Sequence, residues 1–215
     1  MADFIGQAMR FFSRQKPEAT GSLAYRKNRD DIKKGAVPEK YTRVLNLVPG
    51  QRVLELGSAE GVLALLMAER KEKVIGLEIK ADRHEEALRL QSLWARQGKD
   101  VSRCSMLLGN IKDNLHLLDE VDTVVAVRSI YYLRDDIENV FQEIGRRVPN
   151  VLLCGNGSRS RKYYAANGNP DDGLGAFNYY ATLEGMEALL RKCGYEIAHQ
   201  IPDGDPIVIG TKHNV

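Results

Sequence analysis

The stretch 52–78 constrains this chain more than any other, because it alternates two short apolar runs with a glycine-rich turn and a helical pattern. The first apolar run, residues 53–56, stops at Gly57, which is typical of a buried parallel strand. From Val62 onward the apolar residues recur at helical spacing. The second apolar run ends on Glu78. The sequence therefore predicts a strand, a turn, a helix and a second strand, in a segment long enough for a parallel crossover.

The predicted turn suits a ligand. Gly57 and Gly61 stand four positions apart, and without side chains they let backbone N–H groups come close to a bound molecule. The helix that follows presents its N-terminus, which favours anionic groups. Glu78 ends the second strand, where a carboxylate can accept hydrogen bonds from a ribose diol.

The spacing of the turn separates two kinds of cofactor. Dinucleotide-binding turns carry the pattern G-x-G-x-x-G, whereas here residues 58–60 separate only two glycines. Glu55 adds a carboxylate two positions before the first glycine. A carboxylate there would repel a pyrophosphate but attract an ammonium or sulfonium group. These features disfavour a nicotinamide-dependent oxidoreductase.

Residues 55–61 resemble the E/D-x-G-x-x-x-G signature of class I S-adenosylmethionine-dependent methyltransferases, and the resemblance covers about residues 40–155. It implies an enzyme with a Rossmann-like α/β fold: a mostly parallel seven-stranded sheet, helices on both faces and a C-terminal antiparallel hairpin. It also implies S-adenosyl-L-methionine as the cofactor. Two alternatives stay open at this point: another α/β protein with a glycine turn and exposed acids, and a methyltransferase-like protein that binds without catalysis.

The resemblance implies a donor site at the ends of the first three strands and under the N-terminal segment. Glu55 and the glycine turn would hold the methionine part, Glu78 the ribose, and Asn110 the adenine amino group, with Ile111 over the ring. An amide such as Asn110 can both accept and donate a hydrogen bond to adenine. The predicted cofactor-binding residues are Tyr25, Arg26, Glu55, Gly57, Ser58, Gly61, Glu78, Ile79, Asn110, Ile111 and Arg128.

Arg128, Tyr131 and Tyr132 follow the fourth predicted strand, where ligands of parallel sheets bind. We predict them as catalytic residues. Methyl transfer is an in-line displacement that needs positioning, and a base only when the acceptor keeps its proton. No histidine lies in a cleft segment, so the base is Tyr131, Tyr132, an acid, or absent. The alternative is that the two tyrosines simply pack beneath the next helix.

Residues 155–176 are rich in glycine and are predicted as an irregular loop on the acceptor side. Arg159, Arg161 and Lys162 are predicted to bind substrate, because arginine forks suit phosphate and carboxylate; the alternative is a set of solvated loop charges. We therefore expect O-methylation of a small-molecule or glycan acceptor that is anionic. RNA is the main alternative, with protein or lipid also open.

The composition is that of an ordinary globular domain, with 215 residues, 43% hydrophobic and 28% charged. We expect one domain over 1–215, with a helical N-terminal cap over 1–37 that packs on the core, closes the cofactor cleft or lies on a membrane surface. The net charge of +2 does not by itself argue for nucleic acid. Three widely spaced cysteines predict buried thiols of a cytoplasmic protein. We expect no metal, no membrane span and no secretory leader, and the oligomeric state stays open.

Overall fold

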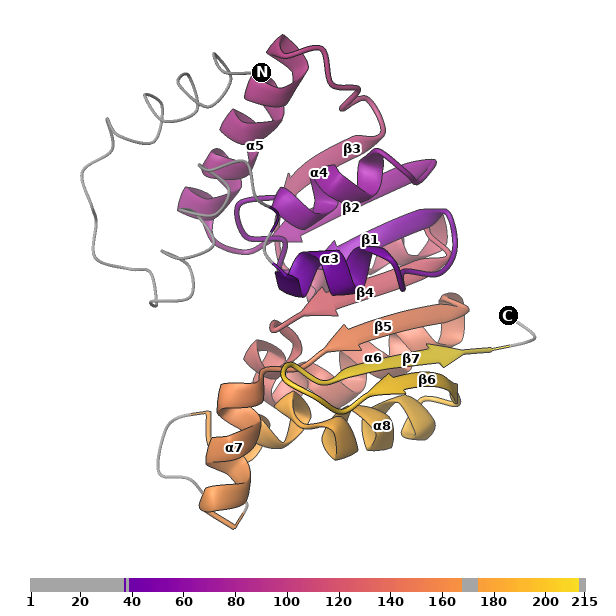
Figure 1. Cartoon of the computed structure of the whole chain (residues 1–215). Helices are drawn as coiled ribbons and strands as arrows, with labels where there is room; N and C mark the ends of the chain where they lie inside the picture. The colour runs from indigo at the N-terminus through magenta and orange to yellow at the C-terminus, as the bar shows by residue number, and fades with distance from the viewer. Residues whose placement is uncertain (1–36, 38, 168–173, 213–215) are drawn as a thin grey trace.

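The computed structural model describes residues 37, 39–167 and 174–212, which build a sheet of seven strands flanked by helices (Figure 1). The strands are β1 (Arg52–Leu56), β2 (Lys73–Glu78), β3 (Cys104–Leu108), β4 (Thr123–Val127), β5 (Asn150–Cys154), β6 (Glu196–Ile201) and β7 (Ile207–Thr211). The α-helices are α3 (Glu39–Leu45), α4 (Val62–Ala68), α5 (Ala81–Arg96), α6 (Ile137–Arg147), α7 (Gly157–Ala165) and α8 (Leu183–Lys192). Short 3-10 helices are η1 (Ile111–Asp113), η2 (Leu115–Glu120), η3 (Ile130–Asp136) and η4 (Ala176–Ala181).

The strand order is β3-β2-β1-β4-β5-β7-β6. Strands β1 to β5 are parallel, while β7 runs antiparallel to both β5 and β6. This arrangement confirms the predicted fold class, including the C-terminal antiparallel hairpin. Because the first five strands are parallel, their carboxyl ends meet at one edge of the sheet. The strand order reverses at the centre, between β1 and β4, which is where open α/β sheets bind ligands.

Alternating side chains of the strands build one apolar core on each face of the sheet. Leu54 and Leu56 of β1 lie in the core that includes residues of α6 and α8. Val53, on the opposite side of the same strand, lies in the core that includes residues of α3, α4 and α5. Figure 1 shows these two groups of helices on opposite faces of the sheet. Strands buried on both sides explain why the sequence shows continuous apolar runs.

The helices α8 and α6 begin in different ways. Thr182 caps α8, since its hydroxyl accepts a hydrogen bond from the Gly185 backbone N–H at 2.9 Å. No side-chain cap is formed at the start of α6, where the Asp136 backbone is helical. The Asp136 carboxylate instead accepts a hydrogen bond from Lys112 at 2.7 Å.

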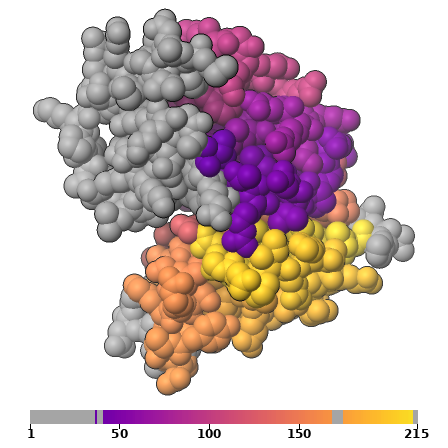
Figure 2. Space-filling view, in the orientation of Figure 1, coloured from indigo at the N-terminus to yellow at the C-terminus, as the bar shows by residue number. Residues whose placement is uncertain are grey.

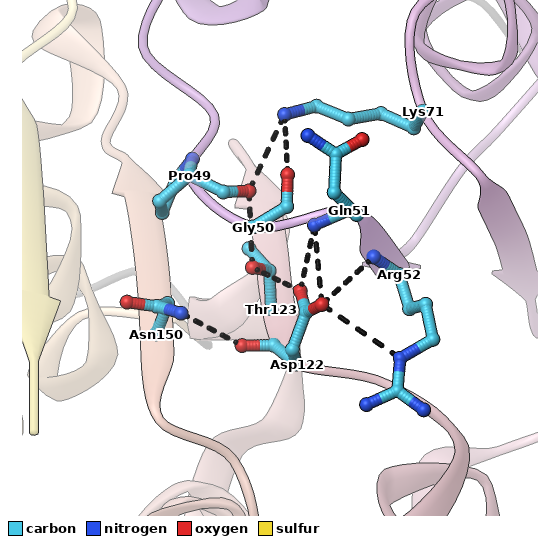
Figure 3. Close-up of polar contacts among 8 residues, drawn as sticks. All are labelled: Pro49, Gly50, Gln51, Arg52, Lys71, Asp122, Thr123 and Asn150. Carbon is cyan, nitrogen blue, oxygen red and sulfur yellow. Dashed lines mark hydrogen bonds and ion pairs between the residues drawn. The ribbon is translucent and has the colours of Figure 1, made fainter.

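Asp122 organises the edge of the sheet opposite the glycine turn (Figure 3). Its carboxylate accepts hydrogen bonds from the backbone N–H groups of Gln51 and Arg52 at 3.1 Å and from the Thr123 hydroxyl at 2.9 Å. The Asn150 amide donates to the Asp122 backbone carbonyl at 3.0 Å. One residue therefore joins the starts of β1, β4 and β5.

Lys71 secures the chain just before β1. Its ammonium donates to the backbone carbonyls of Val48 at 2.8 Å and Gly50 at 2.7 Å (Figure 3 shows the Gly50 contact). Burial lowers the pKa of Lys71, partly offset by the charge of Asp122. These contacts join the segment before β1 to the segment before β2.

The predicted N-terminal cap lies almost entirely outside the described residues, as do Tyr25 and Arg26. Within the described part of the chain, no helix is both long and apolar enough to cross a membrane. No cluster of three or more metal-ligating side chains occurs in that same part.

Candidate functional site

The glycine-rich turn between β1 and α4 has a shape that requires its glycines. Gly57 and Gly61 have φ angles of 74° and 75°, in the left-handed region that favours glycine. A Cβ at Gly57 would lie 2.8 Å from the Cβ of Ser129, closer than real contacts allow. The backbone N–H groups of Gly57 and Ser58 both donate to the Leu77 carbonyl, at 2.8 and 3.1 Å. The turn is thus fixed against β2 and leaves no space for a side chain at Gly57.

Glu78 connects this turn to the end of β2. Its side chain is only 5% exposed, and one carboxylate oxygen accepts the Ala59 N–H at 2.8 Å while the other accepts the Lys80 N–H at 2.9 Å. Each oxygen retains a second lone pair, so the carboxylate can still accept from a diol. Ile79, the next residue, is 62% exposed. A buried carboxylate and an exposed apolar side chain are therefore consecutive residues at the carboxyl end of β2.

Glu55 lies inside β1, on the side of the strand that faces α4 and α5, and is 3% exposed. Burial, with a smaller effect of the Glu55 charge, raises the pKa of the nearby Cys104 thiol to about 12. Cys104, Cys154 and Cys193 are all buried and free of disulfides, as predicted. The role of Glu55 toward an ammonium or sulfonium group stays a prediction.

Asn110 and Ile111 follow β3, and both have structural tasks. The Asn110 side-chain oxygen accepts the Lys112 backbone N–H at 3.1 Å and so caps η1. Ile111 is 4% exposed and belongs to the apolar core. The core thus takes up the side chain that we expected to cover an adenine ring, whereas the exposed Ile79 offers an apolar surface at the same edge.

Arg128 stands at the carboxyl end of β4, but its guanidinium is already matched by a carboxylate. Its Nε donates to Asp205 at 2.7 Å, and its Nη2 forms an ion pair with the same oxygen. The other oxygen of Asp205 accepts the Gly157 backbone N–H at 3.0 Å. An ion pair with a residue of the β6–β7 turn therefore already engages Arg128, and its catalytic and cofactor-binding roles stay predictions.

The β6–β7 turn reaches across to α3 as well. The Arg43 guanidinium donates to the Asp203 backbone carbonyl at 3.1 Å. Figure 2 shows the yellow surface of the hairpin bordering the indigo surface of α3. This turn therefore contacts α3, the end of β4 and the start of α7.

Tyr131 and Tyr132 lie side by side in η3, with ring centroids 4.7 Å apart, yet in different environments. Tyr131 is 1% exposed, and its hydroxyl accepts a hydrogen bond from the Asn156 amide at 3.2 Å. Burial raises the pKa of Tyr131 to about 12, so it stays a neutral phenol at physiological pH. Tyr132 is 58% exposed. The burial of Tyr131 agrees with the alternative that it packs under neighbouring structure, and only Tyr132 presents its ring to solvent.

The prediction that residues 155–176 form an irregular loop is wrong for its first half, which is α7. The Asn156 side chain accepts the backbone N–H groups of Ser158 and Arg159, at 3.1 and 3.3 Å, and so caps this helix. Residues 168–173 lie outside the described part. Helix α7 leaves the carboxyl end of β5 and packs against η4.

Helix α7 carries the three cationic side chains predicted to bind substrate, and their environments differ. The Arg159 guanidinium donates to the Asn178 side chain at 3.0 Å and lies 4.8 Å from the centroid of the Tyr131 ring. Arg161 and Lys162 are exposed on the helix surface. Of the three, Arg159 is the one whose position other side chains fix.

Sequence reasoning missed four residues that shape this edge: Ser129, Asn156, Asn178 and Asp205. The hydroxyl of Ser129 donates to the Leu56 carbonyl at 2.6 Å and so joins β4 to β1 at the glycine turn. The order of the strands carries the signal for Asp205, since the turn that follows β6 reaches the ends of β4 and β5 once β7 lies beside β5. Nothing in the local sequence marks the other three.

Comparison with known proteins agrees with this geometry. Residues 53–149 match the model of a family described as a methyltransferase domain. Among curated protein sequences, none matches this chain significantly.

Several solved structures share the fold. Magnesium protoporphyrin IX methyltransferase (ChlM) from Synechocystis PCC 6803, with bound SAH, is 14% identical with a TM-score of 0.61, over 97% of this chain and 96% of that chain. A TehB-like SAM-dependent methyltransferase from Corynebacterium glutamicum is 13% identical with a TM-score of 0.60, over 88% and 96%. The N-terminal domain of EvdMO1, in the presence of SAH and D-fucose, is 16% identical with a TM-score of 0.56, over 83% and 86%.

Proposed function

We propose that this chain is a class I, Rossmann-like methyltransferase that transfers a methyl group from S-adenosyl-L-methionine to a small-molecule or glycan acceptor that carries a negative charge. The main support for S-adenosyl-L-methionine as the donor is the contact between Glu78 and the glycine-rich turn. The Glu78 carboxylate accepts a hydrogen bond from the Ala59 N–H at 2.8 Å. That contact joins a carboxylate to the glycine-rich turn, at the sheet edge where the side chain of Ile79 is exposed.

The residues at this edge fit the donor. The turn needs glycine at position 57, because a Cβ there would collide with Ser129. Glu78 would accept hydrogen bonds from the ribose, and Ile79, 62% exposed, would pack against the adenine. Asn110 stays a candidate for the adenine amino group, and Glu55 for the methionine ammonium.

When bound, S-adenosyl-L-methionine supplies a methyl group on a positively charged sulfur. The protein then has to hold the acceptor in line and exclude water. Tyr131 does not suit the role of base, because its pKa near 12 keeps it protonated. An acceptor that is already an anion needs no base, which favours O-methylation of an ionised group.

A small acceptor is supported by the charge distribution on the acceptor side. Arg159 is held by Asn178 and by two tyrosine rings, a fixed cation rather than a broad basic surface. Two structures of the same fold are named with small molecules, magnesium protoporphyrin IX in one and D-fucose in the other. The three buried free cysteines favour a cytoplasmic location.

RNA is the second candidate. Helix α7 exposes Arg161, Lys162 and Tyr164, the last at 53%. Basic side chains next to an exposed aromatic ring suit phosphates and unstacked bases. Total cellular RNA offered as acceptor, with methyl incorporation as the measurement, separates this candidate from a small-molecule acceptor.

Calorimetry tests the donor half of the proposal. We expect S-adenosylhomocysteine to bind and NAD not to bind. Tight NAD binding without any response to S-adenosylhomocysteine would contradict the proposal. Turnover is tested by adding donor and an extract of small molecules to the purified protein, with accumulation of S-adenosylhomocysteine as the readout. A protein that retains the donor and forms no product with extracts from several growth conditions would be a binder.

A further inference from the structure

Arg159 is placed by three elements at once. It belongs to α7, its guanidinium lies 4.8 Å from the Tyr131 ring centroid and 5.5 Å from the Tyr132 ring centroid of η3, and it donates to Asn178 of η4 at 3.0 Å. A flexible side chain with this many contacts loses little further freedom when it binds a ligand. The arrangement therefore has the pre-organisation expected of a recognition site.

The support of Arg159 is buried, whereas the surface next to it is open. Tyr131 and Asn178 are 1% and 0% exposed, and the Asn156 amide holds the Tyr131 hydroxyl. The Asn178 side-chain nitrogen, also buried, has no hydrogen-bond partner among the residues that the structure describes. Tyr132 is 58% exposed. A ligand arriving here would meet the Arg159 guanidinium on one side and the aromatic face of Tyr132 on the other.

Among the cations near this site, Arg159 is the one best placed to bind an anion. Arg128, the other arginine at this edge, is paired with Asp205 through two nitrogens. Arg161 and Lys162 are exposed and solvated. The Arg159 guanidinium donates a hydrogen bond to the neutral side-chain amide of Asn178 rather than to a carboxylate. That contact therefore does not neutralise the positive charge of Arg159. A single planar guanidinium suits a monoanionic carboxylate, which it can bind through two parallel hydrogen bonds.

We propose that Arg159 and Tyr132 form an acceptor subsite that selects a planar aromatic carboxylate, with the carboxylate on the guanidinium and the ring against Tyr132. Asn178 is the positioning residue of this subsite. The inference rests on the proposed methyltransferase function and narrows its acceptor to one chemical class. An aromatic ring gains from stacking on tyrosine, whereas a saturated ring of similar size loses that geometry.

The test uses the full chain saturated with S-adenosylhomocysteine. Benzoate, 2-naphthoate and 2-anthroate are titrated as probes, together with the amide of each and with cyclohexanecarboxylate. We expect at least one aromatic carboxylate to bind about tenfold more tightly than its amide, and benzoate more tightly than cyclohexanecarboxylate. Arg159→Lys should weaken the carboxylate about tenfold while S-adenosylhomocysteine affinity is unchanged, because lysine lacks the planar fork. Arg146→Lys, on the exposed surface of α6, is the matched control.

Tyr132→Leu should remove the preference for aromatic over saturated rings. Because Tyr132 is exposed, this variant decides the question even if Arg159→Lys fails to fold. The proposal is overturned if none of the three aromatic carboxylates binds, if amides or the saturated ring bind equally well, or if both arginine variants behave alike. Failure of the wild-type protein to bind S-adenosylhomocysteine would instead overturn the proposed function.

Discussion

Asp205 holds Arg128 across 77 positions of sequence, through a hydrogen bond of 2.7 Å to Nε and an ion pair with Nη2. Both side chains are partly buried, and the second oxygen of Asp205 accepts the Gly157 N–H. The backbone of Arg128 has a φ of 56°, an unusual value for a residue with a Cβ. The pair therefore fixes a strained strand end and the start of α7 together.

Asp205→Asn should lower the free energy of unfolding by about 1–3 kcal/mol, the scale for hydrogen bonds to charged groups. The asparagine keeps an oxygen for Gly157 but loses the charge that matches Arg128. Urea unfolding measures the effect. Asp203→Asn is the control, because Asp203 is exposed and contacts Arg43 through its backbone carbonyl. Equal stability of the two variants would show that the Arg128 pair contributes little.

Gly57→Ala tests the shape of the glycine turn. The left-handed φ of 74° alone should cost about 1–2 kcal/mol, and the collision with Ser129 about 1–3 kcal/mol more. Gly98→Ala is a close control, since Gly98 has a φ of 76° but open space around its Cβ position. We expect Gly57→Ala to unfold more readily than Gly98→Ala and to bind S-adenosylhomocysteine more weakly. Equal thermal stability of both variants would contradict the crowding at Ser129.

Glu78→Ala should weaken S-adenosylhomocysteine binding by roughly 1–3 kcal/mol, because the ribose loses a charged acceptor. It should also destabilise the fold, since the N–H groups of Ala59 and Lys80 lose their partner. Calorimetry and thermal unfolding measure the two effects separately. Glu72→Ala, at an exposed position before β2, is the comparison. If Glu78→Ala and Glu72→Ala bind S-adenosylhomocysteine with equal affinity, Glu78 has a structural role only.

The pKa of Tyr131 predicts a loss of stability at alkaline pH. Its pKa is raised to about 12 in the folded chain, against about 10 when unfolded. The contribution of neutral Tyr131 to the free energy of unfolding is fully present below pH 10. It decreases by up to about 3 kcal/mol as the pH rises toward 12. Tyr131→Phe has no such group, so the difference in unfolding free energy between wild type and variant should shrink across this range. A constant difference from pH 9.5 to 11.5 would show that Tyr131 titrates normally.

Asp122→Asn should separate stability from binding. It lies at the edge opposite the glycine turn, so we expect about 1–3 kcal/mol of lost stability from its weakened contacts with Gln51, Arg52 and Thr123. Affinity for S-adenosylhomocysteine, measured at a temperature where the variant is folded, should be unchanged. A parallel loss of donor affinity would mean that the two edges of the sheet are coupled.

The sheet could be predicted from sequence because its strands are buried on both sides, so residues 53–56 and 74–77 stand out as apolar runs. Helix α7 could not. Gly157 is its only buried residue, so it has no apolar stripe, and its stability depends on the Asn156 cap and on packing against η4. Helix propensity and apolar periodicity do not reveal stabilisation by residues that are distant in the sequence, such as those of η4.

The site, too, has one part that could be predicted from the sequence and one part that could not. The positions of Gly57, Gly61 and Glu78 follow from local spacing, because one turn and one strand end determine them. The acceptor side depends on pairs far apart in the chain, such as Arg159 with Asn178, which local patterns do not encode. An arginine at a strand end looks equally available whether or not a carboxylate such as Asp205 will reach it.

The position of Asp205 so late in the chain has a consequence for the order in which the molecule is completed. During synthesis, residues 52–111 leave the ribosome long before the β6–β7 turn does. A nascent chain that already includes Arg128 and α7 therefore still lacks the carboxylate that contacts both. These contacts can form only after the hairpin that adds β6 and β7 to the sheet has been synthesised.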